Sequence, residues 1–211
     1  MRLGIPVYEG VNLLDVAGPM EMFYWASRAH KLETLLLSEE GRSVKTMSGV
    51  RFETHASFAE APALDVLWVP GGSPTALVKI MKNPKSPYLR YLREIAVGAR
   101  WVCSVCEGAL LLAQAGLLDG HAATTHWAFV KCLQRFPEIK VDTAHKRFVV
   151  SRNRLTGGGI SSGLDEALKL IELLFGKAAA KSVQVTTQYF PKPPIRGVIP
   201  GAPACPIRWN A

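Results

Sequence analysis

Cys106 has the sequence context of a catalytic nucleophile. It follows an apolar segment, residues 101–105, and precedes a charge, a glycine and a second apolar segment, residues 109–112. This pattern is typical of a buried strand that turns sharply into a helix, the arrangement that presents the nucleophile in G-x-S-x-G hydrolases. The N-terminal end of a helix would also favour the thiolate form. The alternative is a buried cysteine that only ends a strand.

Further candidate groups follow other strands of the same expected sheet. Asp15 lies in an apolar context after the first strand, where a carboxyl group holds its proton more tightly, as a general acid must. The alternative for Asp15 is a helix N-terminal cap. Gly71 and Gly72 end another strand, and a glycine pair lets backbone N–H groups approach an anion closely. Because functional groups gather beyond the carboxyl ends of parallel strands, we expect one shared site.

His126, in Thr124-Thr125-His126-Trp127, is a candidate base near Cys106, with a hydrogen-bonded structural histidine as the alternative. The glycine run at residues 157–159 ends a strand and could bind a phosphate, although such a run is weak support alone. No P-loop lysine follows this run, and no G-x-G-x-x-G follows the first strand. We therefore expect no nucleotide cofactor.

The cysteines at positions 103, 106, 132 and 205 are irregularly spaced. In a chain of 211 residues this spacing argues against a disulfide framework. Cys103 falls inside an apolar strand, so its C-x-x-C relation to Cys106 is interpreted as packing. No second pair of ligands stands at a zinc-site spacing, and no metal is expected.

The bulk composition favours a protein that binds neither nucleic acid nor a membrane. The chain is 48% hydrophobic, which allows a sizeable core, but no apolar run reaches the ~18 residues of a membrane helix. The net charge is +8, yet lysine and arginine are scattered without a basic run. The N-terminus does not have the pattern of a secretion signal, and we expect a cytoplasmic protein.

Apolar strand patterns alternate with helical patterns along the chain. Strands are expected at residues 2–7, 32–38, 64–69 and 101–105, with paired segments at 44–54 and 145–156. Helices are expected at residues 19–28, 88–98, 107–115, 126–136, 164–175 and 177–188, with Pro19 in the first turn of the first helix. This alternation predicts an α/β fold, a mostly parallel central sheet with helices on both faces. We expect one domain, residues 1–188, and a proline-rich tail, residues 189–211, that wraps the domain or reaches a neighbouring subunit.

Six segments, in order along the chain, resemble the ThiJ/PfpI superfamily, which is class I glutamine amidotransferase-like. They are Leu14-Asp15-Val16-Ala17-Gly18-Pro19, Val69-Pro70-Gly71-Gly72, Ser104-Val105-Cys106-Glu107-Gly108, Ala115-Gly116-Leu117-Leu118-Asp119-Gly120, Ala123-Thr124-Thr125-His126-Trp127 and Leu155-Thr156-Gly157-Gly158-Gly159-Ile160. The cysteine turn and the Pro-Gly-Gly segment are typical of the superfamily. The first and fifth segments are most similar to the isonitrile hydratase subgroup and its regulator relatives.

The resemblance implies a flavodoxin-like sandwich and a homodimer with the cysteine in a pocket near the subunit interface. In the hydratase subgroup a cysteine and an aspartate are the essential pair, which implies those roles for Cys106 and Asp15. It also implies an oxyanion-type N–H at Gly72 and a pocket wall at Ile160. The implied activity is that of a hydro-lyase: hydration of an isonitrile, a small molecule, to a formamide with neither metal nor organic cofactor.

Glu107 departs from the hydratase subgroup, which has threonine directly after the cysteine. If the Glu107 carboxylate points into the pocket, it raises the pKa of Cys106 and is a candidate base. If it points to solvent in the first helical turn, it is electrostatically favourable there and has no chemical role. Both orientations are compatible with the sequence.

Other activities of the superfamily are the alternatives. They are glyoxalase- or deglycase-like chemistry on small aldehydes, proteolysis with His126 as the base, and a redox sensor in which Cys106 is oxidised to a sulfinate. The same domain type also resembles the sensor half of AraC-type regulators, in which a helix-turn-helix module follows. A proline-rich segment follows here, so a regulator is the less favoured expectation.

Overall fold

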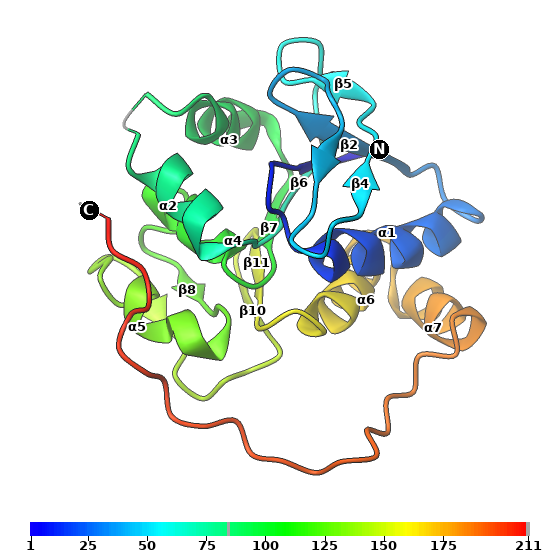
Figure 1. Cartoon of the computed structure of the whole chain (residues 1–211). Helices are drawn as coiled ribbons and strands as arrows, with labels where there is room; N and C mark the ends of the chain where they lie inside the picture. The colour runs from blue at the N-terminus through cyan, green and yellow to red at the C-terminus, as the bar shows by residue number, and fades with distance from the viewer. Residues whose placement is uncertain (84, 210–211) are drawn as a thin grey trace.

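Seven strands form the central sheet of the computed structural model, which describes residues 1–83 and 85–209 (Figure 1). In spatial order they are β10 (Phe148–Ser151), β11 (Arg154–Gly157), β7 (Trp101–Ser104), β6 (Val66–Val69), β1 (Arg2–Pro6), β2 (Glu33–Ser38) and β5 (Ala56–Ser57). All neighbours in this sheet are parallel except β10 and β11. The predicted mostly parallel α/β fold is confirmed.

Helices cover both faces of the sheet (Figure 1). One group packs together on one face: α1 (Leu13–Ser27), α6 (Ser162–Phe175) and α7 (Lys177–Thr186). The other face carries α2 (Pro74–Met81), α3 (Pro87–Gly98), α4 (Gly108–Gln114) and α5 (Val130–Leu133). Smaller elements are the hairpin of β3 (Val44–Lys45) and β4 (Arg51–Phe52), the pair β8 (Ala122–Ala123) and β9 (Lys140–Val141), and the 3₁₀ helix η1 (Trp127–Phe129). None of the helices in the described part of the chain is long and apolar enough to cross a membrane.

The start of α1 differs from its prediction. The helix begins at Leu13, where the Asn12 side chain caps it by accepting a hydrogen bond from the Leu14 N–H. Pro19 therefore lies inside the helix and not in its first turn. Proline has no N–H to donate to the carbonyl four residues earlier, that of Asp15. The Trp68 indole N–H donates to this carbonyl instead, at 3.2 Å, and so ties Asp15 to β6.

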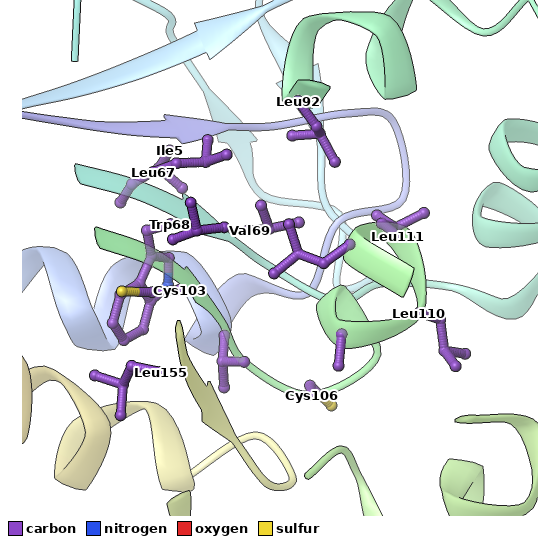
Figure 2. Packing of buried hydrophobic residues seen from close by; sticks show 14 of the residues in the cluster. Ile5, Leu67, Trp68, Val69, Leu92, Cys103, Cys106, Leu110, Leu111 and Leu155 are labelled. Atoms are coloured by element: carbon purple, nitrogen blue, oxygen red, sulfur yellow. The ribbon is translucent and has the colours of Figure 1, made fainter. Parts of the chain in front are cut away.

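A continuous apolar core joins the sheet to the helices and extends to the predicted nucleophile. Trp68 in β6 is fully buried and meets Phe23 of α1 edge to face, with ring centroids 5.4 Å apart. Figure 2 shows the buried side chains of β6, β7 and α4 around this region, with Cys106 at the turn where β7 leads into α4. Tight packing on both sides fixes the position of that turn.

The C-terminal tail returns to the domain and is linked to it covalently. Figure 1 shows the chain leaving α7, running in a wide loop outside the domain and returning past α5. Cys205 in this tail forms a disulfide with Cys132 of α5. The cysteine spacing argued against disulfides, and this expectation is wrong for this pair. The two cysteines are 73 residues apart in the sequence, and only the path of the tail brings them together.

Candidate active site

Cys106 lies on a sharp turn, as predicted. Its φ angle of 56° is in the left-handed region that non-glycine residues rarely adopt. Two hydrogen bonds hold its backbone: its N–H donates to the Gly158 carbonyl at 2.8 Å, and its carbonyl accepts from the Thr125 hydroxyl at 2.8 Å. Gly108 lets the turn pack on β6, because a Cβ at this position would overlap the Val69 carbonyl oxygen. The strained turn is thus held by neighbours from three segments.

Asp15 points into the same site from the first turn of α1. Its side chain is fully buried, and its Oδ2 accepts a hydrogen bond from the Gly71 N–H at 2.9 Å. Because Asn12 caps the helix, the alternative that Asp15 is the cap is wrong. The sequence prediction that places Asp15 and the Pro-Gly-Gly turn at one sheet edge agrees with this contact.

Glu107 also points into the site, which decides between the two orientations that the sequence left open. The residue is 7% exposed, and a Cβ on Gly71 would overlap its Oε2 atom. Burial raises the pKa of Glu107, and weaker effects, of the Cys106 side chain first and of the Gly72 backbone last, oppose it. The Gly72 N–H, predicted to face an anion, thus lies near the Glu107 carboxylate.

Cys106, Asp15 and Glu107 form a buried cluster whose ligand atoms lie within 4.8 Å of one another. Burial, followed by the charge of Glu107, raises the pKa of Asp15 well above its ordinary value. Burial, followed by the charges of Asp15 and Glu107, raises the pKa of Cys106. The expected stabilisation of the thiolate by the helix is therefore outweighed, and the resting sulfur is a thiol that needs a base. Two carboxyl groups with raised pKa values are at hand to donate and accept its proton.

Within residues 1–83 and 85–209, these three side chains form the one cluster of at least three His, Cys, Asp or Glu residues that could bind a metal ion. A metal ion binds the deprotonated forms of cysteine and carboxyl groups. Burial raises the pKa of all three groups, so protons compete with a cation for them.

A hollow of about 300 Å³ is lined by Thr125 and Gly158, which hydrogen-bond the Cys106 backbone, but by none of the three side chains of the cluster. Its walls include His126, Trp127 and Ile160, together with His145 and Ile199. Ile160 also lines the hollow, and its backbone lies close enough to Cys106 to oppose, as a smaller effect, the rise that burial and the two carboxyl groups cause in the pKa of that thiol. A larger hollow of about 470 Å³ opens elsewhere, beside Tyr8 and Tyr88, and none of the predicted site residues lines it.

His126 has a structural contact and is not a partner of Cys106. Its Nδ1 accepts a hydrogen bond from the Ala128 N–H at 3.2 Å and caps η1. Its ring lies against Gly159, where a Cβ would overlap the imidazole. Burial lowers the pKa of His126, so the ring is held neutral. The histidine forms a wall of the hollow, and the bases next to the sulfur are carboxyl groups.

Glu166 is a buried carboxyl that the sequence reasoning missed. It is fully buried in α6, next to Gly157, and no cation pairs with it in the described part of the chain. Burial, followed by the charge of Asp15, raises the pKa of Glu166 well above its ordinary value. An available signal was its position on the buried stripe of the helix, between Gly163 and Ala167.

Glu166→Gln is expected to stabilise the protein increasingly as the pH rises. The folded state holds the Glu166 proton to a higher pH than the unfolded chain does, so wild-type stability falls from the ordinary pKa of 4.5 up to the raised one. The limiting slope is about 1.4 kcal/mol per pH unit for one group. Urea unfolding of both proteins at pH 5, 7 and 8.5 measures this difference. A difference in unfolding free energy that does not change with pH would contradict a buried, protonated Glu166.

The family model described as "DJ-1/PfpI family" matches residues 1–173 of the chain. Isonitrile hydratase of Pseudomonas putida is 34% identical over 194 residues, which cover 92% of this chain and 81% of that protein. The transcriptional regulator GbdR of Pseudomonas aeruginosa is 29% identical and matches 86% of this chain, which spans 48% of the regulator. The chain therefore corresponds to about half of that relative.

Solved structures show the same fold. A THiJ/PfpI family protein from Pseudomonas syringae superposes with a TM-score of 0.83 at 30% identity, covering 92% of this chain and 77% of that one. DJ-1beta of Drosophila melanogaster has a TM-score of 0.77 at 19% identity, covering 89% of this chain and 97% of that one. The second likeness shows the fold alone. These comparisons confirm the family resemblance that the six sequence segments carry.

Proposed function

The chain belongs to the DJ-1/PfpI family, and we propose that it is a cysteine-dependent hydratase that adds water to an isonitrile and releases an N-substituted formamide. The observation that carries the proposal is the buried cluster of Cys106, Asp15 and Glu107. It combines a sulfur nucleophile on a strained turn with two carboxyl groups of raised pKa. The 34% identity to a protein described as isonitrile hydratase supports the same substrate class.

The first proposed step forms a covalent adduct. Glu107 accepts the thiol proton of Cys106 as the sulfur attacks the terminal carbon of the isonitrile. Negative charge develops on that carbon, and Asp15 transfers its proton there. The product is a thioimidate, with Asp15 ionised and Glu107 protonated. In this division of roles Asp15 begins protonated and is the acid, and Glu107 begins ionised and is the base.

The second proposed step uses water and restores the site. Asp15 takes a proton from water as the hydroxyl adds to the thioimidate carbon, and Glu107 returns its proton to the nitrogen. The tetrahedral intermediate then collapses. Its hydroxyl proton returns to the sulfur through Glu107, the carbon–sulfur bond breaks, and the formamide leaves. The site ends as it began, with Asp15 protonated, Glu107 ionised and Cys106 a thiol. The chemistry proceeds without a cofactor.

Other residues of the site have supporting roles in the proposal. The Gly72 N–H lies near Glu107 and donates to the oxygen that develops charge in the tetrahedral intermediate. Ile160 and His126 line the hollow that receives the substituent of the isonitrile. The substrate is thus a small molecule whose reactive carbon is at Cys106 and whose substituent extends beyond Ile160.

The proposal includes a cytoplasmic homodimer that binds neither nucleic acid nor a membrane. Exposed apolar side chains border the site: Leu14 and Ile160 are each 39% exposed, and Met47 and Val50 lie on the β3–β4 hairpin. The hairpin is held next to the start of α1, because the Met47 N–H donates to the Val11 carbonyl at 3.0 Å. A second copy would cover this surface and close the site. Light scattering in solution measures the assembly directly.

The proposed activity is tested by a comparison of two substrate classes. Purified protein is incubated with cyclohexyl isocyanide or with methylglyoxal, a small 2-oxoaldehyde, and both products are quantified by mass spectrometry. The proposal expects N-cyclohexylformamide and no lactate. Lactate without formamide would replace the hydratase by a glyoxalase-like activity at the same cysteine.

A further inference from the structure

The described part of the C-terminal tail, residues 189–209, borders the hollow that Thr125 and Gly158 connect to the Cys106 backbone. Figure 1 shows the tail, in orange to red, crossing from α7 towards α5. Its apolar side chains are mostly open to solvent, with Ile195 at 82% and Val198 at 95% exposure. Ile199 is the exception among these three. It is 49% exposed and lines the hollow, which it shares with Ile160, His126 and Trp127.

Two anchors hold the far end of the tail. The disulfide between Cys132 and Cys205 ties it to α5, six positions after Ile199. Trp209 is the second anchor, with 3% of its surface exposed and its indole N–H donating to the Gln114 Oε1 at 3.0 Å. The Arg135 guanidinium lies 4.3 Å from the centre of its ring, a cation–π contact. Ile199 is thus kept near the hollow by a covalent link and a buried aromatic residue.

We propose that this tail is the outer wall of the substrate pocket, that Ile199 is a specificity-determining contact in it, and that the Cys132–Cys205 disulfide fastens it. The identity of the substrate rests on the proposed function, but the position of the wall does not. An isonitrile whose carbon meets Cys106 directs its substituent past Ile160 into the hollow. The hollow of about 300 Å³ has an apolar side that includes Ile160, Trp127 and Ile199, and a polar side that includes Lys146 and Arg147. It suits a compact substituent whose hydrocarbon part packs on the two isoleucines.

A thiol reductant loosens the wall. Two thiol groups of the reductant supply two electrons and two protons, the sulfur–sulfur bond between Cys132 and Cys205 breaks, and the reductant becomes a disulfide. Trp209 and weaker contacts then remain as the anchors of the tail. Thiol reductants are abundant in the cytoplasm. The pocket of the reduced protein therefore admits bulkier substituents and holds compact ones less well.

The attachment of the tail by the Cys132–Cys205 disulfide is tested first, without any substrate. Thiol titration of the unreduced, denatured protein is expected to find two free thiols, those of Cys103 and Cys106, and four after reduction. Trypsin cuts after the exposed Arg196, and on a denaturing gel the fragment that follows is expected to stay attached until a reductant is added. Four free thiols before reduction, or a fragment that separates without reductant, would show that the disulfide does not hold the tail.

The wall is tested by variants of neighbouring tail residues. Ile199→Ala is expected to raise KM for cyclohexyl isocyanide about fivefold at unchanged kcat, because a half-buried side chain loses apolar contact with the substituent. Val198→Ala, at the more exposed neighbouring position, is the matched control and is expected to leave KM unchanged. Cys205→Ser combined with Trp209→Ala is expected to exceed the effect of Ile199→Ala and to lower KM for an isonitrile with a bulkier substituent.

A second readout separates this proposal from the hydratase itself. Alkylation of Cys106 by iodoacetamide, followed by peptide mass spectrometry, measures access to the site without turnover. Its rate is expected to rise in Ile199→Ala and further in Cys205→Ser/Trp209→Ala, but not in Val198→Ala. Equal alkylation rates in all four proteins would overturn the wall even if isonitriles are hydrated. Alkylation rates that change as expected would support the wall even if isonitriles are not hydrated.

Discussion

Cys106→Ser is expected to lower kcat/KM for isonitrile hydration by about 10⁴-fold or more, as loss of a covalent nucleophile does. Serine has a similar size, but a carboxylate such as Glu107 is too weak a base to ionise its hydroxyl group. Formamide formation at saturating cyclohexyl isocyanide measures the loss. The reason is chemical and not structural, because the turn at residue 106 is held by backbone contacts to Gly158 and Thr125.

Cys103→Ala is the matched control for that variant. Cys103 is the other free cysteine, three positions earlier in β7, and it is equally buried. We expect Cys103→Ala to keep turnover within a few-fold of wild type. Comparable losses in both variants would point to packing, and a Cys106→Ser protein that retains activity would remove the sulfur from the mechanism.

Asp15→Asn is expected to lower kcat/KM by about 10³-fold, because asparagine has no proton to give to the developing carbanion. The amide keeps the size of the side chain and an oxygen that can accept from the Gly71 N–H. Asp65→Asn is the control, since Asp65 is an exposed carboxyl that bonds the Arg2 N–H before β6 begins. If Asp15→Asn and the wild type have equal kcat/KM, Asp15 is not the acid, and Glu107 is the remaining carboxyl group that can donate the proton.

The pH dependence of the wild-type rate follows from the same two groups. The rate is expected to fall with rising pH when Asp15 loses its proton, at a pH well above the ordinary pKa of a carboxyl group. It is expected to fall with falling pH when Glu107, whose pKa is also raised, becomes protonated. Glu107→Gln removes a negative charge next to Asp15, which lowers the pKa of Asp15 and moves the alkaline limb to lower pH. If the alkaline limb does not move, the charge of Glu107 does not act on the pKa of Asp15, and the proposed coupling of the two groups is wrong.

The positions of Cys106, Asp15 and the Pro-Gly-Gly turn were predictable because each follows a buried strand. In a parallel sheet, residues after strands meet at one edge, and glycines there mark close backbone approach. The α/β fold followed from the same alternation of strands and helices. The helix α2 was missed although Ser73 and Pro74 are a cap and a first-turn proline, which is a readable start signal.

The orientation of Glu107 was not predictable from its position in the sequence. It depends on the left-handed φ angle at Cys106 and on the space left by Gly71, which the fold determines and no local pattern reports. The disulfide of Cys132 with Cys205 has the same origin, since it requires the tail to return across the domain. Long-range contacts of this kind leave no periodic signal in the sequence.

The bond between Cys106 and the substrate carbon is the central claim, and acid-quenched mass spectrometry of the first turnover tests it most directly. The protein is mixed with excess cyclohexyl isocyanide, stopped in acid at millisecond intervals, and digested. The mechanism predicts a peptide containing Cys106 that is heavier by one whole isonitrile molecule, because addition expels no group, and this adduct decays as formamide appears. Formamide produced at the wild-type rate by Cys106→Ser, with that peptide unmodified at every time point, would contradict it.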